Sequence, residues 1–342
     1  MIESGETTIS KFVLHRVSIE NEKSFTNDKV YEITNQEEDE TFRRIFLKPF
    51  HASSITYEFR HEVDIELNTL LKISKGIFQG DDFLLRSLNI YQHLSAVSKH
   101  PNIKDGDLFI VKFEDIKLNN KLYEGLGIYK IENKESFIET SSGRQGSIGL
   151  SFRKGIGSKR LDKACLIVFT EEPYTVLVID SNSNETDYWQ NEFLKVDFRK
   201  DHVNSTNHFL SLTKSFVTEQ MPEDFDVSKA DQIDLLNRSV DYFKKHESFD
   251  KNEFEDEVLK DKGIIKSFRD FDTTYREENE LELGDTFEIS QKAVKKQARI
   301  FKSVLKLDKN FHIYIHGNRE LIEQGVDSDG RKFYKIYYEE EN

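Results

Sequence analysis

The chain has 342 residues and a formal net charge of −14 at pH 7, with 37% hydrophobic and 33% charged residues. That length allows two domains, and the 27 Phe and 13 Tyr residues supply much of the volume that a core needs. The single cysteine, Cys165, excludes an internal disulfide and a cysteine-based zinc cluster, and its apolar neighbours predict a buried position. The acidity opposes nucleic-acid binding by the surface as a whole but leaves binding through one local patch open.

No segment of the sequence predicts export or membrane insertion. The first residues lack a basic stretch followed by an apolar one, so we expect no secretory signal peptide. No apolar run approaches the ~20 residues that a membrane helix needs. A single cysteine also fits a reducing compartment, so the sequence predicts a cytoplasmic protein.

The first half of the chain predicts a mixture of strands and helices. Residues 9–19 alternate between apolar and polar side chains, as a half-buried strand does. Helical spacing follows at residues 39–51, 64–77 and 81–99. Short β-branched or aromatic runs between turn residues then predict strands at 107–113, 122–131, 137–140, 164–169 and 175–180.

A glycine-rich basic segment, residues 141–163, separates the third and fourth of these strands. It has five glycines and one acid, Asp162, and its cations are Arg144, Arg153, Lys154, Lys159, Arg160 and Lys163. The glycine spacing fits neither the dinucleotide fingerprint nor a P-loop. Two interpretations stay open: a flexible loop between strands, or a mobile cationic loop that contacts a phosphate backbone.

From residue 200 the pattern becomes helical, at residues 202–219, 229–246, 252–260 and 262–270. Residues 247–285 are strongly acidic and predict a solvated helical surface. Near the end of the chain, residues 311–316 and 320–326 predict two strands paired across Gly317-Asn318. Asp329-Gly330 predicts a hairpin turn into residues 332–338.

A basic helix is predicted at residues 290–307, with Ser290 as its N-cap. At roughly 100° per residue its cations fall within an arc of about 120°. They are Lys292, Lys295, Lys296, Arg299, Lys302 and Lys306. No acid lies between Lys292 and Leu307, so the helix does not neutralise its own charge. The face is interpreted either as a solvated surface that the preceding acidic segment pairs with, or as a surface for an anion such as nucleic acid.

The sequence predicts no catalytic residue, no metal site and no cofactor. His61-Glu62 and Asp64 lack the second histidine of a zincin motif. His312 and His316 share one face of a predicted strand but have no acid or cysteine at ligand spacing. No serine, threonine or cysteine lies in a known activation motif.

The order of several segments resembles the bacterial 37-kDa nucleoid-associated protein family over roughly residues 15–338. The segments are F-V-L-H-R-V near the start, H-P-N-I-K-D-G-D-L-F-I-V-K-F at residues 100–113, L-D-K-A-C-L-I-V-F at 161–169, Y-W-Q-N-E-F-L-K-V at 188–196, and the basic helix followed by F-H-I-Y-I-H-G-N-R-E-L-I. The resemblance implies a cytoplasmic protein of the nucleoid whose partner is DNA or a DNA-bound protein, and it implies no enzyme. Extra acids at residues 37–40 and 247–285 depart from it and leave partner-mediated association open.

Together these patterns predict an α+β protein with two domains. Residues 1–199 form a mixed domain of antiparallel strands and helices, and residues 200–342 form a helical domain that ends in a small antiparallel sheet. The predicted function is nucleoid association through non-specific binding of double-stranded DNA, with the basic helix and the glycine-rich segment as contact surfaces. The alternatives are an adaptor that binds a DNA-bound protein and an unrecognised nucleic-acid-processing enzyme, and self-association is left open.

Overall fold

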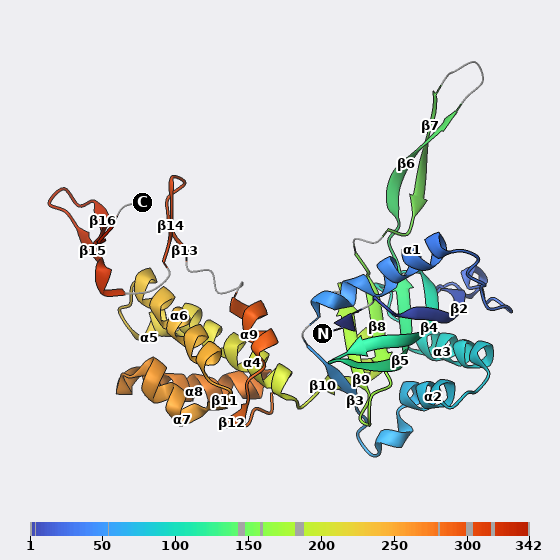
Figure 1. The fold of residues 1–342 in the computed structure, drawn as a ribbon, viewed down its shortest axis with the longest axis horizontal. Helices are drawn as coiled ribbons and strands as arrows, with labels where there is room; N and C mark the ends of the chain where they lie inside the picture. Colours follow the sequence, from blue (N-terminus) through green and yellow to red (C-terminus); the bar gives the residue numbers. More distant parts are fainter. Residues whose placement is uncertain are drawn as a thin grey trace. The chain divides into compact units, whose positions relative to one another are not determined.

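The computed structural model describes the chain except for residues 1, 4, 54, 143–147, 158–159, 182–187, 280, 299–303, 316–318 and 341–342. The chain divides into two compact units, Met1–Arg199 and Lys200–Asn342, which are described separately (Figure 1). Mostly antiparallel strands with helices make up the first unit, and the second is helical and ends in small sheets. The predicted α+β class is confirmed.

An antiparallel eight-stranded sheet forms the centre of the first unit. Its strands run in the order β1-β4-β5-β8-β9-β3-β10, and β2 also pairs with β4. Their bounds are β1 Ile2–Glu3, β2 Thr8–Val17, β3 Tyr57–Phe59, β4 Gly106–Leu118, β5 Lys121–Ile131, β8 Lys163–Val168, β9 Thr175–Asp180 and β10 Val196–Phe198. β8 is buried along its whole length, as its run of apolar residues predicts, and Cys165 is among its buried residues.

Alternate strand residues point to opposite sides of this sheet, so apolar residues lie on both faces. Helices cover both of these faces. Ile110 and Ile128 pack on one face with α2 (Thr69–Phe78) and α3 (Phe83–Val97). Val111 and Tyr129 pack on the other face with α1 (Gln36–Phe46) and the 3-10 helix η2 (Lys48–Ala52). The remaining helical turns are η1 Asn21–Lys23, η3 Ile65–Leu67 and the π-helix η5 Trp189–Leu194.

A two-stranded ribbon, called the β-arm here, replaces the predicted glycine-rich loop. It pairs β6 (Glu135–Ser142) with β7 (Ile148–Gly155) and extends from the first unit (Figure 1). In this register Ile138 and Phe152 are opposite one another, so they share a face with Leu150 and Ile148. All four are exposed, which leaves the β-arm with one apolar face open to solvent. The prediction of an irregular loop through residues 148–155 was wrong, because Phe152, Leu150 and Ile148 alternate with polar residues as strand residues do.

The second unit packs its helices around an aromatic core. Phe209, Phe243, Phe249, Phe254 and Phe268 meet at ring-centroid distances between 4.2 and 6.2 Å. The core elements are α4 His202–Ser215, the π-helix η6 Phe216–Gln220, α5 Met221–Asp224, α6 Lys229–Lys245, α7 Lys251–Phe254, the π-helix η7 Glu255–Leu259, α8 Lys262–Glu278 and α9 Gln291–Ala298. The short strands β11 (Ser248–Asp250) and β12 (Thr286–Glu288) pair beside them.

Two small hairpins end the second unit, and one of them differs from the predicted pairing. β13 (Val304–Leu307) pairs with β14 (Phe311–Tyr314), so β14 does not pair with the strand that follows it. After the short 3-10 helix η8 (Arg319–Leu321), β15 (Ile322–Val326) pairs with β16 (Lys332–Ile336). Gly330 has a φ of +80° between the latter two strands, which confirms the predicted Asp329-Gly330 turn.

Among the described residues, no helix has both the length and the apolar character that crossing a membrane requires.

Candidate nucleic-acid interface

Helix α9 begins where the sequence predicts it and turns two lysines to solvent. Ser290 is buried at its start, and its hydroxyl accepts a hydrogen bond from the Ala293 amide at 3.4 Å, so the predicted N-cap is confirmed. Ala293 and Val294 pack inward, whereas Lys292 and Lys295 are exposed. The apolar positions therefore anchor the helix and fix the side on which its cations lie.

These two lysines are not neutralised by the acidic segment. Within the described part of the chain, Lys292 and Lys295 have no ion-pair partner. The buried acids of that segment pair instead with cations of the same segment: Asp272 binds Lys251 at 2.6 Å and Arg276 at 2.6 Å. Lys296, the next cation of α9, is half-buried, and this burial lowers its pKa.

The predicted basic helix is longer than the helix in the structure. α9 ends at Ala298, and Lys306 lies in β13, opposite His312 of β14. Asp308 adopts a positive φ of 50° in the turn between these strands. The prediction that Lys306 belongs to the helix was therefore wrong. Arg299 and Lys302 lie outside the described residues.

The cations of the glycine-rich segment are dispersed. On β7, Arg153 pairs with Glu139 at 3.0 Å and Lys154 is exposed. Arg160 is exposed and donates a hydrogen bond to the backbone carbonyl of Ser181 at 3.3 Å. Arg144 and Lys159, also predicted as contacts, lie outside the described residues.

Lys163 belongs to the core of the first unit and not to a binding surface. Its ammonium lies 2.6 Å from Asp180, with only 2% and 7% of the two side chains exposed. It also lies 5.1 Å from the ring centre of Tyr188. A second buried lysine, Lys130, pairs beside it with Glu132 at 2.9 Å. Lys163 cannot reach a phosphate from this position, and its prediction as a contact is corrected.

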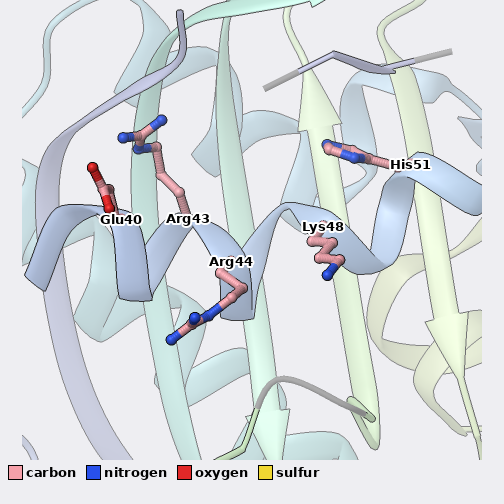
Figure 2. Close-up of a pocket in the computed structure, with 5 residues that line it drawn as sticks. All are labelled: Glu40, Arg43, Arg44, Lys48 and His51. Atoms are coloured by element: carbon pink, nitrogen blue, oxygen red, sulfur yellow. The ribbon is translucent and has the colours of Figure 1, made fainter. Parts of the chain in front are cut away.

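A basic pocket that the sequence reasoning missed lies on α1 and η2. It has a volume of about 270 Å³ and is lined by Glu40, Arg43, Arg44, Lys48 and His51. Arg44 and Lys48 extend to the same side of the ribbon, and Arg43 and Glu40 extend to the opposite side (Figure 2). Arg43 pairs with Asp39 at 2.8 Å. Arg44 and Lys48 are exposed and have no ion-pair partner among the described residues. Their spacing of four residues without an intervening acid is the signal that could have found them.

His51 gives this pocket a polar group that is partly withdrawn from water. Its Nε2 atom is buried and has no hydrogen-bond partner among the described residues. Burial and the nearby Lys48 ammonium lower its pKa, so the ring is neutral at pH 7 and the positive charge of the pocket comes from its lysine and arginines.

Among the described residues, His61 and His312, which were singled out in the sequence, belong to no group of potential metal ligands. His61 Nδ1 accepts the backbone N–H groups of Val63 and Asp64 at 3.3 and 3.4 Å, which is a local turn. His312 is exposed on β14, and His316 lies outside the described residues.

Comparison with protein families adds what this geometry does not. The model of the family described as nucleoid-associated protein YejK matches residues 13–336. The chain belongs to this family. No curated protein and no solved structure was found to match the chain. The family gives the chain a nucleoid-associated role.

Proposed function

We propose that this member of the family associates with the cytoplasmic nucleoid by binding duplex DNA directly and without base preference. The observation that carries the proposal is a pair of exposed lysines on α9, Lys292 and Lys295, which have no ion-pair partner among the described residues, in a protein whose net charge is −14. Cations that contact phosphates release condensed counterions, and this gives affinity without reading base edges. The acidic residues of the protein limit contact with DNA to local basic surfaces, because they repel DNA elsewhere.

Arg44 and Lys48 form the second proposed contact surface. Both side chains extend to one side of α1 and η2, which presents two cations on the same surface (Figure 2). Lys154 and Arg160 are further exposed cations of the first unit. The proposal includes no sequence preference and no chemical step on the DNA.

The experiment is equilibrium binding of the full-length, tag-free protein to two unrelated duplexes across a salt series. We expect equal affinity for both and a log–log salt slope of about −2 or steeper, because each neutralised phosphate contributes close to one unit. The same samples, incubated with Mg²⁺ or Mn²⁺, should leave the DNA intact. Absence of binding at low salt would reject direct association, and cleavage that copurifies with the protein would reject the non-enzymatic function.

A second candidate function is supported by the β-arm. Ile148 and Phe152 are 80% and 76% exposed on its apolar face, which is typical of a surface that contacts another protein. In this case the chain is an adaptor that joins the nucleoid through a DNA-bound protein. The variant Ile148→Ser/Phe152→Ser then loses its nucleoid location in cells while its binding to purified duplex DNA is unchanged.

A further inference from the structure

Three potential metal ligands meet where α6 ends and α7 begins, in the second unit. His246 follows the last residue of α6, Glu253 lies in α7, and Glu257 lies in the π-helix η7. The short strand β11 lies between the two helices in the chain, and the Asp250 carboxylate caps α7 by accepting the amides of Asn252 and Glu253. The four-residue spacing of the two glutamates places both carboxylates on the helix face that meets His246.

The histidine presents a nitrogen lone pair to both carboxylates. Its Nδ1 lies 2.9 Å from the backbone carbonyl of Tyr242, which can only accept, so Nδ1 is the nitrogen that carries the proton. The other nitrogen, Nε2, lies 3.9 Å from Glu253 Oε1 and 3.8 Å from Glu257 Oε1. These separations are too long for hydrogen bonds. One donor atom from each residue lies within 4.8 Å of the other two.

Surrounding groups hold the ligands in this arrangement. The Tyr242 hydroxyl donates to Glu253 Oε2 at 2.8 Å, and the Tyr242 and His246 rings stack at 4.1 Å. Gln291 of α9 donates to the backbone carbonyl of His246 at 3.3 Å. No lysine or arginine lies within ion-pair distance of Glu253 or Glu257 in the described part of the chain. A histidine oriented by a backbone carbonyl and a carboxylate oriented by a hydroxyl are the usual outer-shell supports of metal ligands.

We propose that His246, Glu253 and Glu257 bind one divalent transition-metal ion. One imidazole and two carboxylates suit Zn²⁺, Co²⁺ or Mn²⁺, whereas Mg²⁺ and Ca²⁺ prefer all-oxygen sites. Metal–nitrogen and metal–oxygen bonds of about 2.0–2.2 Å span a ligand separation of up to roughly 4 Å, which is the separation between Nε2 and each carboxylate. The half-exposed glutamates bring their oxygens to the ion by side-chain rotation, and water completes the coordination.

The ion has a structural consequence within the second unit. It joins the end of α6 to α7 and η7, and Gln291 links the same point to the start of α9. Metal binding therefore stabilises the fold that positions Lys292 and Lys295. The inference does not depend on DNA binding, because it rests on the ligand atoms alone.

The experiment is calorimetric titration of chelator-treated, tag-free protein with each metal ion alone. We expect Zn²⁺ and Co²⁺ to bind at one ion per chain and to raise the thermal unfolding midpoint by several degrees, and Mg²⁺ at equal concentration to do neither. His246→Gln, Glu253→Gln and Glu257→Gln should each weaken Zn²⁺ binding at least tenfold. The matched controls, His202→Gln and Glu223→Gln, are exposed residues of the same unit and should bind Zn²⁺ as the unchanged protein does.

Glu257→Gln keeps the test valid if the histidine variant fails to fold, because Glu257 is half-exposed. The visible spectrum of the Co²⁺-loaded protein provides an independent readout, which should change on adding one equivalent and stay unchanged in Glu257→Gln. Equal Zn²⁺ affinity in the three ligand variants and in the unchanged protein would overturn the site, as would Mg²⁺ binding as tightly as Zn²⁺. Loss of DNA binding would bear on the proposed function and not on this site.

Discussion

Two lysines of the first unit's sheet and two lysines of α9 lie in opposite surroundings. Lys130 and Lys163 have exposed side-chain fractions of 0% and 2% and are paired with Glu132 and Asp180. Lys292 and Lys295 stand in solvent without an ion-pair partner among the described residues. Buried cations are costly unless paired, so the first set stabilises one packing arrangement. Exposed cations carry little free-energy cost and are accessible to an anion.

A cation's neighbours in the fold, and not the local charge of the sequence, decide its role. Lys163 lies in the positively charged segment 141–163, yet it starts a fully buried strand and faces Asp180 in register. Lys292 follows the strongest acidic segment of the chain, yet the buried acids of that segment are taken by Lys251, Arg276 and Arg269.

The largest effect on stability is expected for the buried lysines of the first unit. Replacing Lys163 by Met should lower the free energy of unfolding by about 3–5 kcal/mol, because the Asp180 carboxylate keeps its buried position without this cation. Urea denaturation of the variant measures the change. Lys154→Met, at an exposed position in the same basic segment, should stay within about 0.5 kcal/mol. Similar effects for the two variants would remove the distinction between them.

A buried histidine of the first unit should make its stability depend on pH. His15 Nδ1 accepts the Asn27 amide at 3.2 Å and Nε2 lies 3.0 Å from Ser87 Oγ, so the ring is neutral with its proton on Nε2. Burial lowers the pKa of His15 to about 4 from the ordinary 6.5. The unfolded chain takes up the proton first as the pH falls, so the stabilisation is complete above pH 6.5 and is lost progressively down to about pH 4.

The expected loss across that window is on the order of 3 kcal/mol from this residue alone. Denaturation curves at a series of pH values measure it, and subtracting the curve of His15→Asn removes the contribution of the carboxylates. If the two proteins lose stability in parallel between pH 6.5 and 4, His15 does not titrate as its burial predicts.

A smaller effect is expected at the start of α9. Ser290→Ala removes the side-chain acceptor of the Ala293 amide and should cost about 1 kcal/mol, the usual value for an N-cap. Thermal unfolding measures it. Lys292→Gln, two residues further on and exposed, keeps a good helix former and should cost less than about 0.5 kcal/mol. A larger loss in the lysine variant than in the serine variant would mean that this lysine stabilises the fold.

Much of the fold followed from local sequence patterns. The prediction and the structure differ where pairing between strands decides the conformation. The Asp329-Gly330 turn and the Ser290 cap were predicted because each depends on a few adjacent residues. The end of α9 was not, because Val304–Leu307 forms a strand only against β14 across the turn at Asp308.

The candidate sites were less predictable than the fold, since they depend on tertiary neighbours. The exposure of Lys292 and Lys295 agrees with the predicted helix face, and their role as contacts stays a prediction. Burial removes Lys163 from that set, and no local property of the sequence distinguishes it from Lys154. His246, Glu253 and Glu257 come from the end of α6, from α7 and from η7, and their sequence spacing matches no metal motif.

The most direct test of the exposed α9 lysines compares two double variants that have the same net charge. The quantity compared is the salt dependence of their binding to duplex DNA. Lys292→Gln/Lys295→Gln removes two exposed lysines from α9, and Lys262→Gln/Lys266→Gln removes two exposed lysines from α8. Both variants lower the net charge equally, so any difference in duplex binding comes from position. The account predicts that the α9 pair flattens the slope of log affinity against log salt by about 2 units on every sequence, and that the α8 pair leaves it unchanged. Equal slopes for the two variants would contradict the claim that α9 contacts DNA.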